Sequence, residues 1–339
     1  MIVVDRVSKF YGRNAAVRDL DFRIEEGECV GFLGLNGAGK STTLRLLSCL
    51  LLPTSGRVTI RGFDVEEQPH EIRKLIGYLP DEPPLYPEMR VEEFLRFAGK
   101  LRRMSAEQLQ LRLPKVMAQT GLEAVRDQTI GTLSHGYQQR VGIAQAIVHE
   151  PALLILDEPI QGLDPVQIVE MRALIRSLRG EHTILLSSHI LSEIEQTCDR
   201  ILMLHDGRIV AQGTEDELVH GMGEGPAGYR EALTAHWVEL EVRGDEEALR
   251  GALALEGVEI VELTRGSSDV LRVKVKSVSE ARELLATQIV NAGLGLRGLR
   301  RTSSALEDVF VRLSQGERPD EAPEKDMLED KLEGKEVRA

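Results

Sequence analysis

The chain reads Gly34-Leu35-Asn36-Gly37-Ala38-Gly39-Lys40-Ser41-Thr42 directly after an apolar run, Cys29 to Leu33, that predicts a buried strand. The spacing Gly-x-x-x-x-Gly-Lys-Ser is typical of a phosphate-binding loop. Glycines allow a backbone to wrap a polyphosphate and to aim its N–H groups at the oxygens, and a helix that starts near Lys40 adds its positive N-terminal dipole. We therefore expect Lys40 to reach the β- and γ-phosphates of a nucleotide and the Ser41 hydroxyl to ligate Mg²⁺.

The residues after this loop favour a strand–loop–helix unit. The stretch from Thr42 to Leu52 carries apolar residues in helical spacing, and Pro53 and Gly56 are expected to stop the helix. A glycine-rich segment can be an ordinary turn, but a strand before it and a helix after it favour nucleotide binding. The loop does not by itself identify the reaction, because kinases, GTPases and many ATPases share it.

A second motif narrows the class of protein. Leu153 to Leu156 is a short apolar run that predicts a fully buried parallel strand, and the acids Asp157 and Glu158 follow it directly. In an α/β sheet the carboxyl end of such a strand opens on the ligand crevice. We expect Asp157 to hold Mg²⁺, directly or through water, and Glu158 to accept a proton from an attacking water.

The third motif is Leu133-Ser134-His135-Gly136-Tyr137-Gln138-Gln139-Arg140, which opens an apolar helix. A serine and a glycine at a helix N-terminus predict a second anion site. Together the three motifs resemble those of the nucleotide-binding subunits of ATP-binding cassette (ABC) transporters, whose signature is Leu-Ser-Gly-Gly-Gln. Here His135 replaces the first Gly and Tyr137 replaces the Gln. This form resembles the branch associated with type-2 exporters and gliding motility.

Further elements of that family follow in order. Gly162-Leu163-Asp164-Pro165 resembles the D-loop, which in the family reaches across a dimer. His189 follows the strand-like run Thr183 to Ser188 and resembles the switch histidine that contacts the γ-phosphate. Tyr11 lies where the family places an aromatic residue that stacks on adenine.

One residue of the expected metal site departs from the family pattern. After Ile76-Gly77-Tyr78-Leu79-Pro80 the family commonly has a Gln that contacts Mg²⁺ and water, and this chain has Asp81. Asp81 can accept a hydrogen bond from a metal-bound water, although its side chain is shorter than that of Gln and carries a charge. We expect it to contribute to the metal site.

The composition fits this assignment. The 339 residues allow more than one domain, and 42% are hydrophobic. The net charge of −13 argues against nonspecific binding to DNA or anionic lipid. We expect no membrane helix and no signal peptide, because no apolar run approaches the roughly 20 residues that span a bilayer. Cys29, Cys49 and Cys198 lie in apolar contexts, which favours buried thiols in a reducing compartment.

The motifs and the changes in pattern suggest four segments. Residues 1–219 carry every motif, with a mainly helical insertion from about Val91 to Ile130. Residues 220–235 are glycine-rich and read as a linker. Residues 236–315 alternate strands and helices in an order that resembles a ferredoxin-like domain, with a last helix from Ser304. Residues 316–339 are charged and without aromatics, which predicts a disordered tail.

The predicted fold class is therefore α/β, a P-loop NTPase of the ABC ATPase type with a helical subdomain and a small α+β domain. Catalytic roles are expected for Glu158 and His189, and metal contacts for Ser41, Asp81 and Asp157. The predicted ATP contacts are Tyr11, Gly34, Leu35, Asn36, Gly37, Ala38, Gly39, Lys40, Ser41, Thr42, Ser134, Gly136 and Asp164.

The resemblance also implies partners. It predicts a homodimer or paired cassette with composite ATP sites, and a separate integral membrane permease. It places the chain in the cytoplasm, at the inner face of the cell membrane, and no nucleic-acid partner is expected. A soluble cassette ATPase that acts on ribosomes or DNA stays open as an alternative, although such proteins usually carry two cassettes or a long coiled-coil insertion. A nonenzymatic ATP sensor is disfavoured by the pair Asp157-Glu158.

Overall fold

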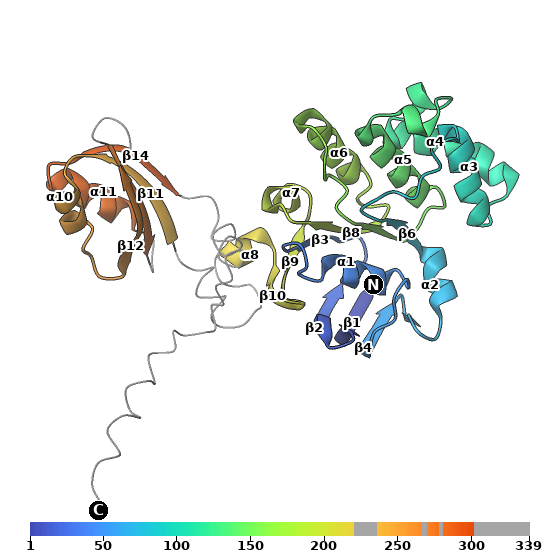
Figure 1. The fold of residues 1–339 in the computed structure, drawn as a ribbon, viewed down its shortest axis with the longest axis horizontal. Helices are drawn as coiled ribbons and strands as arrows, with labels where there is room; N and C mark the ends of the chain where they lie inside the picture. Colours follow the sequence, from blue (N-terminus) through green and yellow to red (C-terminus); the bar gives the residue numbers. More distant parts are fainter. Residues whose placement is uncertain (220–235, 266–269, 278–280, 302–339) are drawn as a thin grey trace, which may run out of the picture. The chain divides into compact units, whose positions relative to one another are not determined.

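The computed structural model describes residues 1–219, 236–265, 270–277 and 281–301. The chain divides into two compact units, of which the first is Met1–Leu218 and the second contains the described residues from His236 onward (Figure 1). The predicted linker at 220–235, the helix from Ser304 and the tail at 316–339 lie outside the described residues.

A six-stranded sheet forms the centre of the first unit and confirms the predicted α/β class. Its neighbouring strands pair in parallel, except that β10 runs antiparallel to β9. The strands predicted from apolar runs are present, and every residue of β3, β7 and β8 is buried. The spatial order is β10 (Arg208–Gly213), β9 (Arg200–His205), β3 (Cys29–Leu33), β8 (Thr183–Ser188), β7 (Leu153–Leu156) and β6 (Ile76–Leu79).

The order of these parallel strands decides where the motifs meet. The carboxyl ends of β3, β8, β7 and β6 lie at one edge of the sheet, because parallel strands point the same way. The phosphate loop follows β3, Asp157 follows β7, His189 follows β8 and Asp81 comes two residues after β6. Segments that are far apart in the sequence are thus brought to one edge.

An antiparallel sheet and α1 (Lys40–Leu47) complete the core on one side of the parallel sheet. The rings of Phe22 and Phe32 meet edge to face, with centroids 5.6 Å apart, and so join the two sheets. Leu44 and Leu47 of α1 are buried in the same cluster. The order of this second sheet is β2 (Asn14–Ile24), β1 (Ile2–Tyr11), β4 (Ser55–Ile60) and β5 (Phe63–Asp64).

The helix α1 is shorter than the sequence predicted. Its last residue is Leu47 rather than Leu52, and Cys49 takes a left-handed backbone with φ of +56°. The N–H groups of Leu50 and Leu51 both donate to the Arg45 carbonyl and close the turn. Leu51 is half-buried against the core, so its place in the apolar pattern reflects packing beyond the helix end.

The predicted helical insertion contains α3 and α4. In Figure 1 the helices α3 to α6 gather on the side of the parallel sheet away from β1, β2 and β4. Ser105 and Gln108 form a reciprocal capping box at the start of α4, and Gly121 ends it in a left-handed conformation. Across the described residues no helix combines the length and apolarity that a bilayer span requires. The helices are α2 (Pro69–Leu75), α3 (Val91–Leu101), α4 (Ala106–Thr120), α5 (His135–Ile147), α6 (Pro165–Ser177), α7 (Leu191–Glu195) and α8 (Glu215–Val219), with 3₁₀ turns at Glu123–Val125 and Ile130–Thr132.

The second unit has the predicted βαββαβ order. All its strand pairs are antiparallel and the spatial order β12-β13-β11-β14 is that of a ferredoxin-like sheet. The core cluster joins Val238, Leu240 and Val242 of β11 to the two helices. The elements are β11 (His236–Arg243), α10 (Glu246–Ala252), β12 (Val258–Arg265), β13 (Val270–Ser277), α11 (Arg282–Asn291) and β14 (Gly295–Arg301).

His149, just after α5, predicts a pH dependence of stability. Burial and the nearby Arg102 lower its pKa from the usual value to about 4, while Nε2–H donates to the Ile76 carbonyl at 3.0 Å. Between about pH 6.5 and 4 the unfolded chain therefore binds a proton that the folded chain does not, so stability falls as the pH falls. Between pH 7 and 5 the free energy of unfolding, measured by calorimetry, should fall by about 1–2 kcal/mol less in His149→Gln than in wild type. An equal fall in His149→Gln and wild type would contradict this prediction. A reduced fall of the same size in the exposed control His70→Gln would also contradict it.

Candidate functional site

The phosphate loop surrounds a pocket of about 320 Å³ at the start of α1. Gly37 and Gly39 have φ of +87° and +105°, which only glycine adopts without strain, and a Cβ on Gly39 would lie 2.8 Å from the Ala16 carbonyl oxygen. No side chain caps α1, so its first N–H groups stay free for an anion. The lining residues are Ala16, Leu35, Asn36, Gly37, Gly39, Lys40, Ser41, Thr42, Asp81, Glu158 and Gln161.

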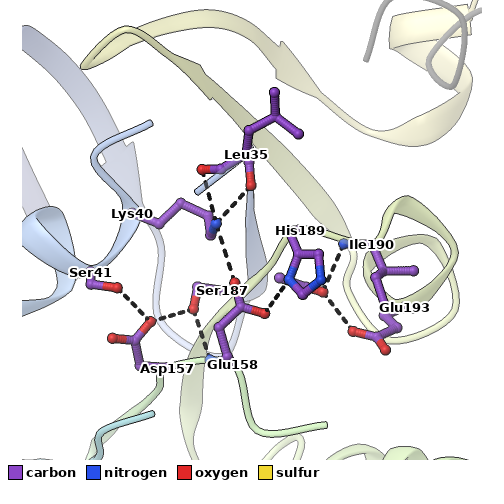
Figure 2. A network of polar contacts seen from close by, with 11 residues as sticks. Leu35, Lys40, Ser41, Asp157, Glu158, Ser187, His189, Ile190 and Glu193 are labelled. Carbon is purple, nitrogen blue, oxygen red and sulfur yellow. Dashed lines mark hydrogen bonds and ion pairs between the residues drawn. The ribbon is translucent and has the colours of Figure 1, made fainter. Parts of the chain in front are cut away.

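Lys40 is a buried cation beside this pocket. Its Nζ donates to the Gly34 carbonyl at 2.6 Å and to the Leu35 carbonyl at 3.3 Å, and lies 3.2 Å from Glu158 Oε1 (Figure 2). The side chain is 5% exposed, so little water screens the charge. The ammonium group is therefore already in place to pair with an anion in the loop.

Asp157 is fixed by two hydroxyl groups. Ser187 Oγ donates to Asp157 Oδ1 at 2.6 Å, and Ser41 Oγ donates to the same oxygen at 3.2 Å. Ser187 also accepts the Glu158 backbone N–H at 2.9 Å, so one hydroxyl at the end of β8 positions both acids (Figure 2). Sequence reasoning missed Ser187, because only the pairing of β7 with β8 brings it to the acids.

Glu158 connects the phosphate loop to the switch histidine. Its carboxylate is 9% exposed, with Oε1 toward Lys40 and Oε2 3.0 Å from Nδ1 of His189 (Figure 2). Its backbone has φ of +48°, a left-handed conformation that is uncommon for any residue other than glycine. Strain of this kind costs of order 1–3 kcal/mol and concentrates at functional sites.

A buried carboxyl group supports the loop around His189. Ser188 Oγ donates to Glu193 Oε2 at 2.6 Å and accepts the Ile190 N–H at 3.0 Å (Figure 2). Burial raises the pKa of Glu193 above its usual value. These contacts hold the backbone on both sides of the imidazole, and sequence reasoning did not single out either residue.

Asp81 lines the pocket, at the position where the sequence suggested a metal ligand. Partial burial raises its pKa, and the charges of Asp157 and Glu158 raise it further. The Asp81 carboxylate is therefore close to two other negative charges, and the phosphates of a bound nucleotide would add more.

The other predicted ATP contacts do not line the pocket of their own chain. Ser134 is the N-cap residue of α5, and Asp164 caps α6 by accepting the N–H groups of Val166 and Gln167. Gly136 packs so closely on Gln167 that a Cβ would lie 2.6 Å from its side chain. Their roles toward a second chain stay predictions.

Tyr11 ends β1 as a half-exposed ring, outside the residues that line the pocket. The Lys9 ammonium lies 5.8 Å from its ring centroid. One face of an exposed aromatic ring is suited to stack on a base, so the adenine contact also stays a prediction.

Comparison with known proteins identifies the family. The ABC transporter family profile matches residues 17–161, which contain the phosphate loop, the signature and both acids. An uncharacterized ABC transporter ATP-binding protein of Bacillus subtilis (strain 168), YxlF, is 33% identical over 92% of this chain and 99% of its own length. This chain belongs to the ABC transporter ATP-binding proteins.

Two further similarities extend the comparison. The Nod factor export ATP-binding protein I of Cupriavidus pinatubonensis is 34% identical over 93% of this ABC subunit and 91% of its own length. A dimeric structure of the cassette MJ0796, in a post-hydrolysis state bound to ADP and Pi, is 28% identical, with a TM-score of 0.58 over 63% of this chain and 98% of that one. The first unit is thus an ATP-binding cassette.

Gln161 is a pocket residue of this ABC cassette that sequence reasoning missed. It lies three residues after Glu158, and its N–H donates to the Glu158 carbonyl at 3.2 Å. That turn returns the chain to the pocket, where Gln161 joins Asp81 in the lining. The signal in the sequence was only the short spacing from Glu158.

Replacement of Lys40 tests the phosphate loop. Lys40→Ala should lower ATP affinity by roughly 10²-fold or more, because it removes a buried cation from a site for a polyanion. Titration calorimetry with ATP measures the loss. The exposed substitution Lys100→Ala, on α3, is the matched control and should bind ATP as wild type does. Unchanged affinity in Lys40→Ala would exclude the loop as the phosphate site.

Proposed function

We propose that this ABC ATPase hydrolyses MgATP in a dimer with composite sites and drives export through a separate membrane permease. One observation carries the proposal. The Glu158 carboxylate lies at the wall of the phosphate pocket, 3.2 Å from the Lys40 ammonium and 3.0 Å from His189 Nδ1. A carboxylate so placed can accept a proton from a water that attacks the terminal phosphate.

Binding of ATP would redistribute the contacts of Lys40. Phosphate oxygens in the pocket carry more negative charge than the Gly34 and Leu35 carbonyls to which Nζ now donates. Lys40 then turns to the phosphates, and its pairing with Glu158 weakens. The Lys40–Glu158 ion pair thus engages the proposed base until a nucleotide binds. The hydrogen bond to His189 keeps the Glu158 carboxylate oriented.

The residues present also fit Mg²⁺. Ser41 Oγ and Asp157 Oδ1 lie 3.2 Å apart, and both are hard oxygen ligands of the kind that Mg²⁺ takes together with phosphate oxygens and water. When bound there, the ion would neutralise charge on the β- and γ-phosphates. Ser187 would hold Asp157 in the orientation that this contact needs.

The surface around the motifs favours pairing of two chains. Ser134 and Asp164 lie outside their own pocket, yet the family resemblance assigns both to ATP. Val166, Val169 and Ile190 are 68%, 64% and 41% exposed beside Asp164 and His189. Exposed apolar side chains next to a functional site indicate an interaction surface. We therefore propose that a second chain supplies Ser134 and Gly136 to each nucleotide.

The export role rests on a relative. The Nod factor protein carries export in its name and aligns with nearly the whole of this chain. Such a role requires a permease, and it would place this subunit at the inner face of the membrane. The alternative, a cassette that acts on ribosomes or DNA, is disfavoured by the net charge of −13.

Substitution of the proposed base separates ATP binding from hydrolysis. Glu158→Gln keeps the shape of the side chain but cannot take a proton, so turnover should fall by about 10² to 10⁴-fold while ATP still binds. Phosphate release measures turnover. Light scattering should show a dimer that forms with ATP and persists.

The control for this dimer is Ser134→Arg. A long charged side chain at the start of α5 should block closure, so the double variant Glu158→Gln, Ser134→Arg should stay monomeric with ATP. Hydrolysis by Glu158→Gln at the wild-type rate would rule out Glu158 as the base. A persistent dimer in the double variant would instead reject the role of Ser134.

Purification from the native host tests the partner. The tagged Glu158→Gln chain, solubilised with mild detergent and ATP, should retain a polytopic membrane protein, and Lys40→Ala should retain less of it. Recovery of ribosomes or DNA in place of a membrane protein would favour the soluble alternative.

A further inference from the structure

Gln161 lines the nucleotide pocket and carries a side-chain amide. Among the residues that line the pocket, side-chain amides come from Asn36, within the phosphate loop, and from Gln161, which lines the pocket together with Glu158 and Asp81. Gln161 is exposed, and its backbone N–H and carbonyl groups both take part in hydrogen bonds.

The backbone of Gln161 is held on both sides. Its N–H donates to the Glu158 carbonyl at 3.2 Å, and its own carbonyl lies 3.2 Å from Nε2 of His135. A carbonyl can only accept, so Nε2 carries the proton and His135 is the donor. The loop that presents Gln161 is therefore tied both to the proposed base and to the signature segment of the same chain.

Gly162 lies beside the imidazole of His135. It has φ of +75°, and a Cβ there would be 3.4 Å from His135 Nε2 and 3.5 Å from Cδ2. Glycine takes this left-handed conformation without strain. His135, one of the two residues at which the signature departs from the family, thus contacts its own chain.

The chemistry of the pocket gives the amide a role. Asp81 lies where related proteins commonly have Gln, and it shares the pocket with Asp157 and Glu158. An ionised carboxylate only accepts hydrogen bonds, whereas an amide can also donate to a phosphate oxygen. Outside the phosphate loop and the start of α1, the pocket is lined by Ala16, Asp81, Glu158 and Gln161, and of these Gln161 carries the neutral amide donor.

We propose that Gln161 donates a hydrogen bond to the terminal phosphate of bound ATP, and that His135 is a positioning residue that holds the Gln161 loop in place. The first part concerns binding and the second concerns geometry. Both rest on the proposed ATP site, but neither requires that the chain hydrolyse ATP.

Affinities for two nucleotides test the contact. With a nonhydrolysable ATP analogue, AMP-PNP, and with ADP, titration calorimetry compares ligands that differ by the terminal phosphate. Gln161→Ala should weaken AMP-PNP binding about ten-fold and ADP binding less than two-fold, at protein concentrations where light scattering shows a monomer. Gln161→Glu should weaken AMP-PNP more, because it adds a carboxylate. The control Gln110→Ala, on the exposed side of α4, should change neither affinity.

The result separates this inference from the proposed function. Equal losses for AMP-PNP and ADP, or no loss, would overturn the Gln161 contact even if the wild-type chain hydrolyses ATP. A selective loss for AMP-PNP would support the contact even if no hydrolysis were found.

A double-mutant cycle tests His135. His135→Phe keeps a ring against Gly162 but removes the donor, so it should lower AMP-PNP affinity about three-fold and leave ADP affinity unchanged. His135→Gln, which can still donate, should recover most of the loss. In a Gln161→Ala background, His135→Phe should have no further effect. An equal loss in that background would show that His135 does not act through Gln161.

Discussion

The carboxylate of Glu158 is held from two sides inside the cassette, by the ammonium of Lys40 and by the imidazole of His189. Its backbone N–H is held by Ser187, whose hydroxyl also fixes Asp157. Lys40 begins the helix that follows β3, whereas Ser187 lies near the end of β8 and His189 directly follows β8. The side chain is almost fully buried, and a buried charge without partners would cost several kcal/mol. The sheet order therefore brings together the partners that compensate the burial of this carboxylate.

The same arrangement explains the strained backbone. A left-handed φ at Glu158 turns the chain sharply after β7 and is maintained because the N–H of this residue is tied to β8. The turn also returns Gln161 to the pocket. Strain of a few kcal/mol is tolerable where buried strands such as β7 and β8 contribute many apolar contacts, so the fold of the sheet stabilises the geometry of the site.

Two departures from the family pattern are linked to the loop that carries Gln161. His135 stands where the family signature has a glycine, and Asp81 where the family commonly has a glutamine. The imidazole donates to the loop that carries Gln161, and Gln161 lines the pocket with Asp81. The first of these departures thus contacts the Gln161 loop, and the second shares a pocket with it. The second unit has its own core, and the residues that line the nucleotide pocket all belong to the first unit.

The sequence by itself determined the fold class, the three buried strands and the nucleotide-binding motifs, because glycine spacing, apolar runs and adjacent acids are local patterns with local physical causes. It also predicted the βαββαβ order of the second unit. It overestimated the length of α1, because helical spacing of leucines cannot distinguish a helix from apolar residues packed beyond its end. Only the tertiary structure decided that Ser187, Glu193 and Gln161 support the site, and that His135 contacts its own chain. Those contacts depend on which strands are neighbours and where a turn returns the chain, and such long-range pairing leaves no local mark in the sequence.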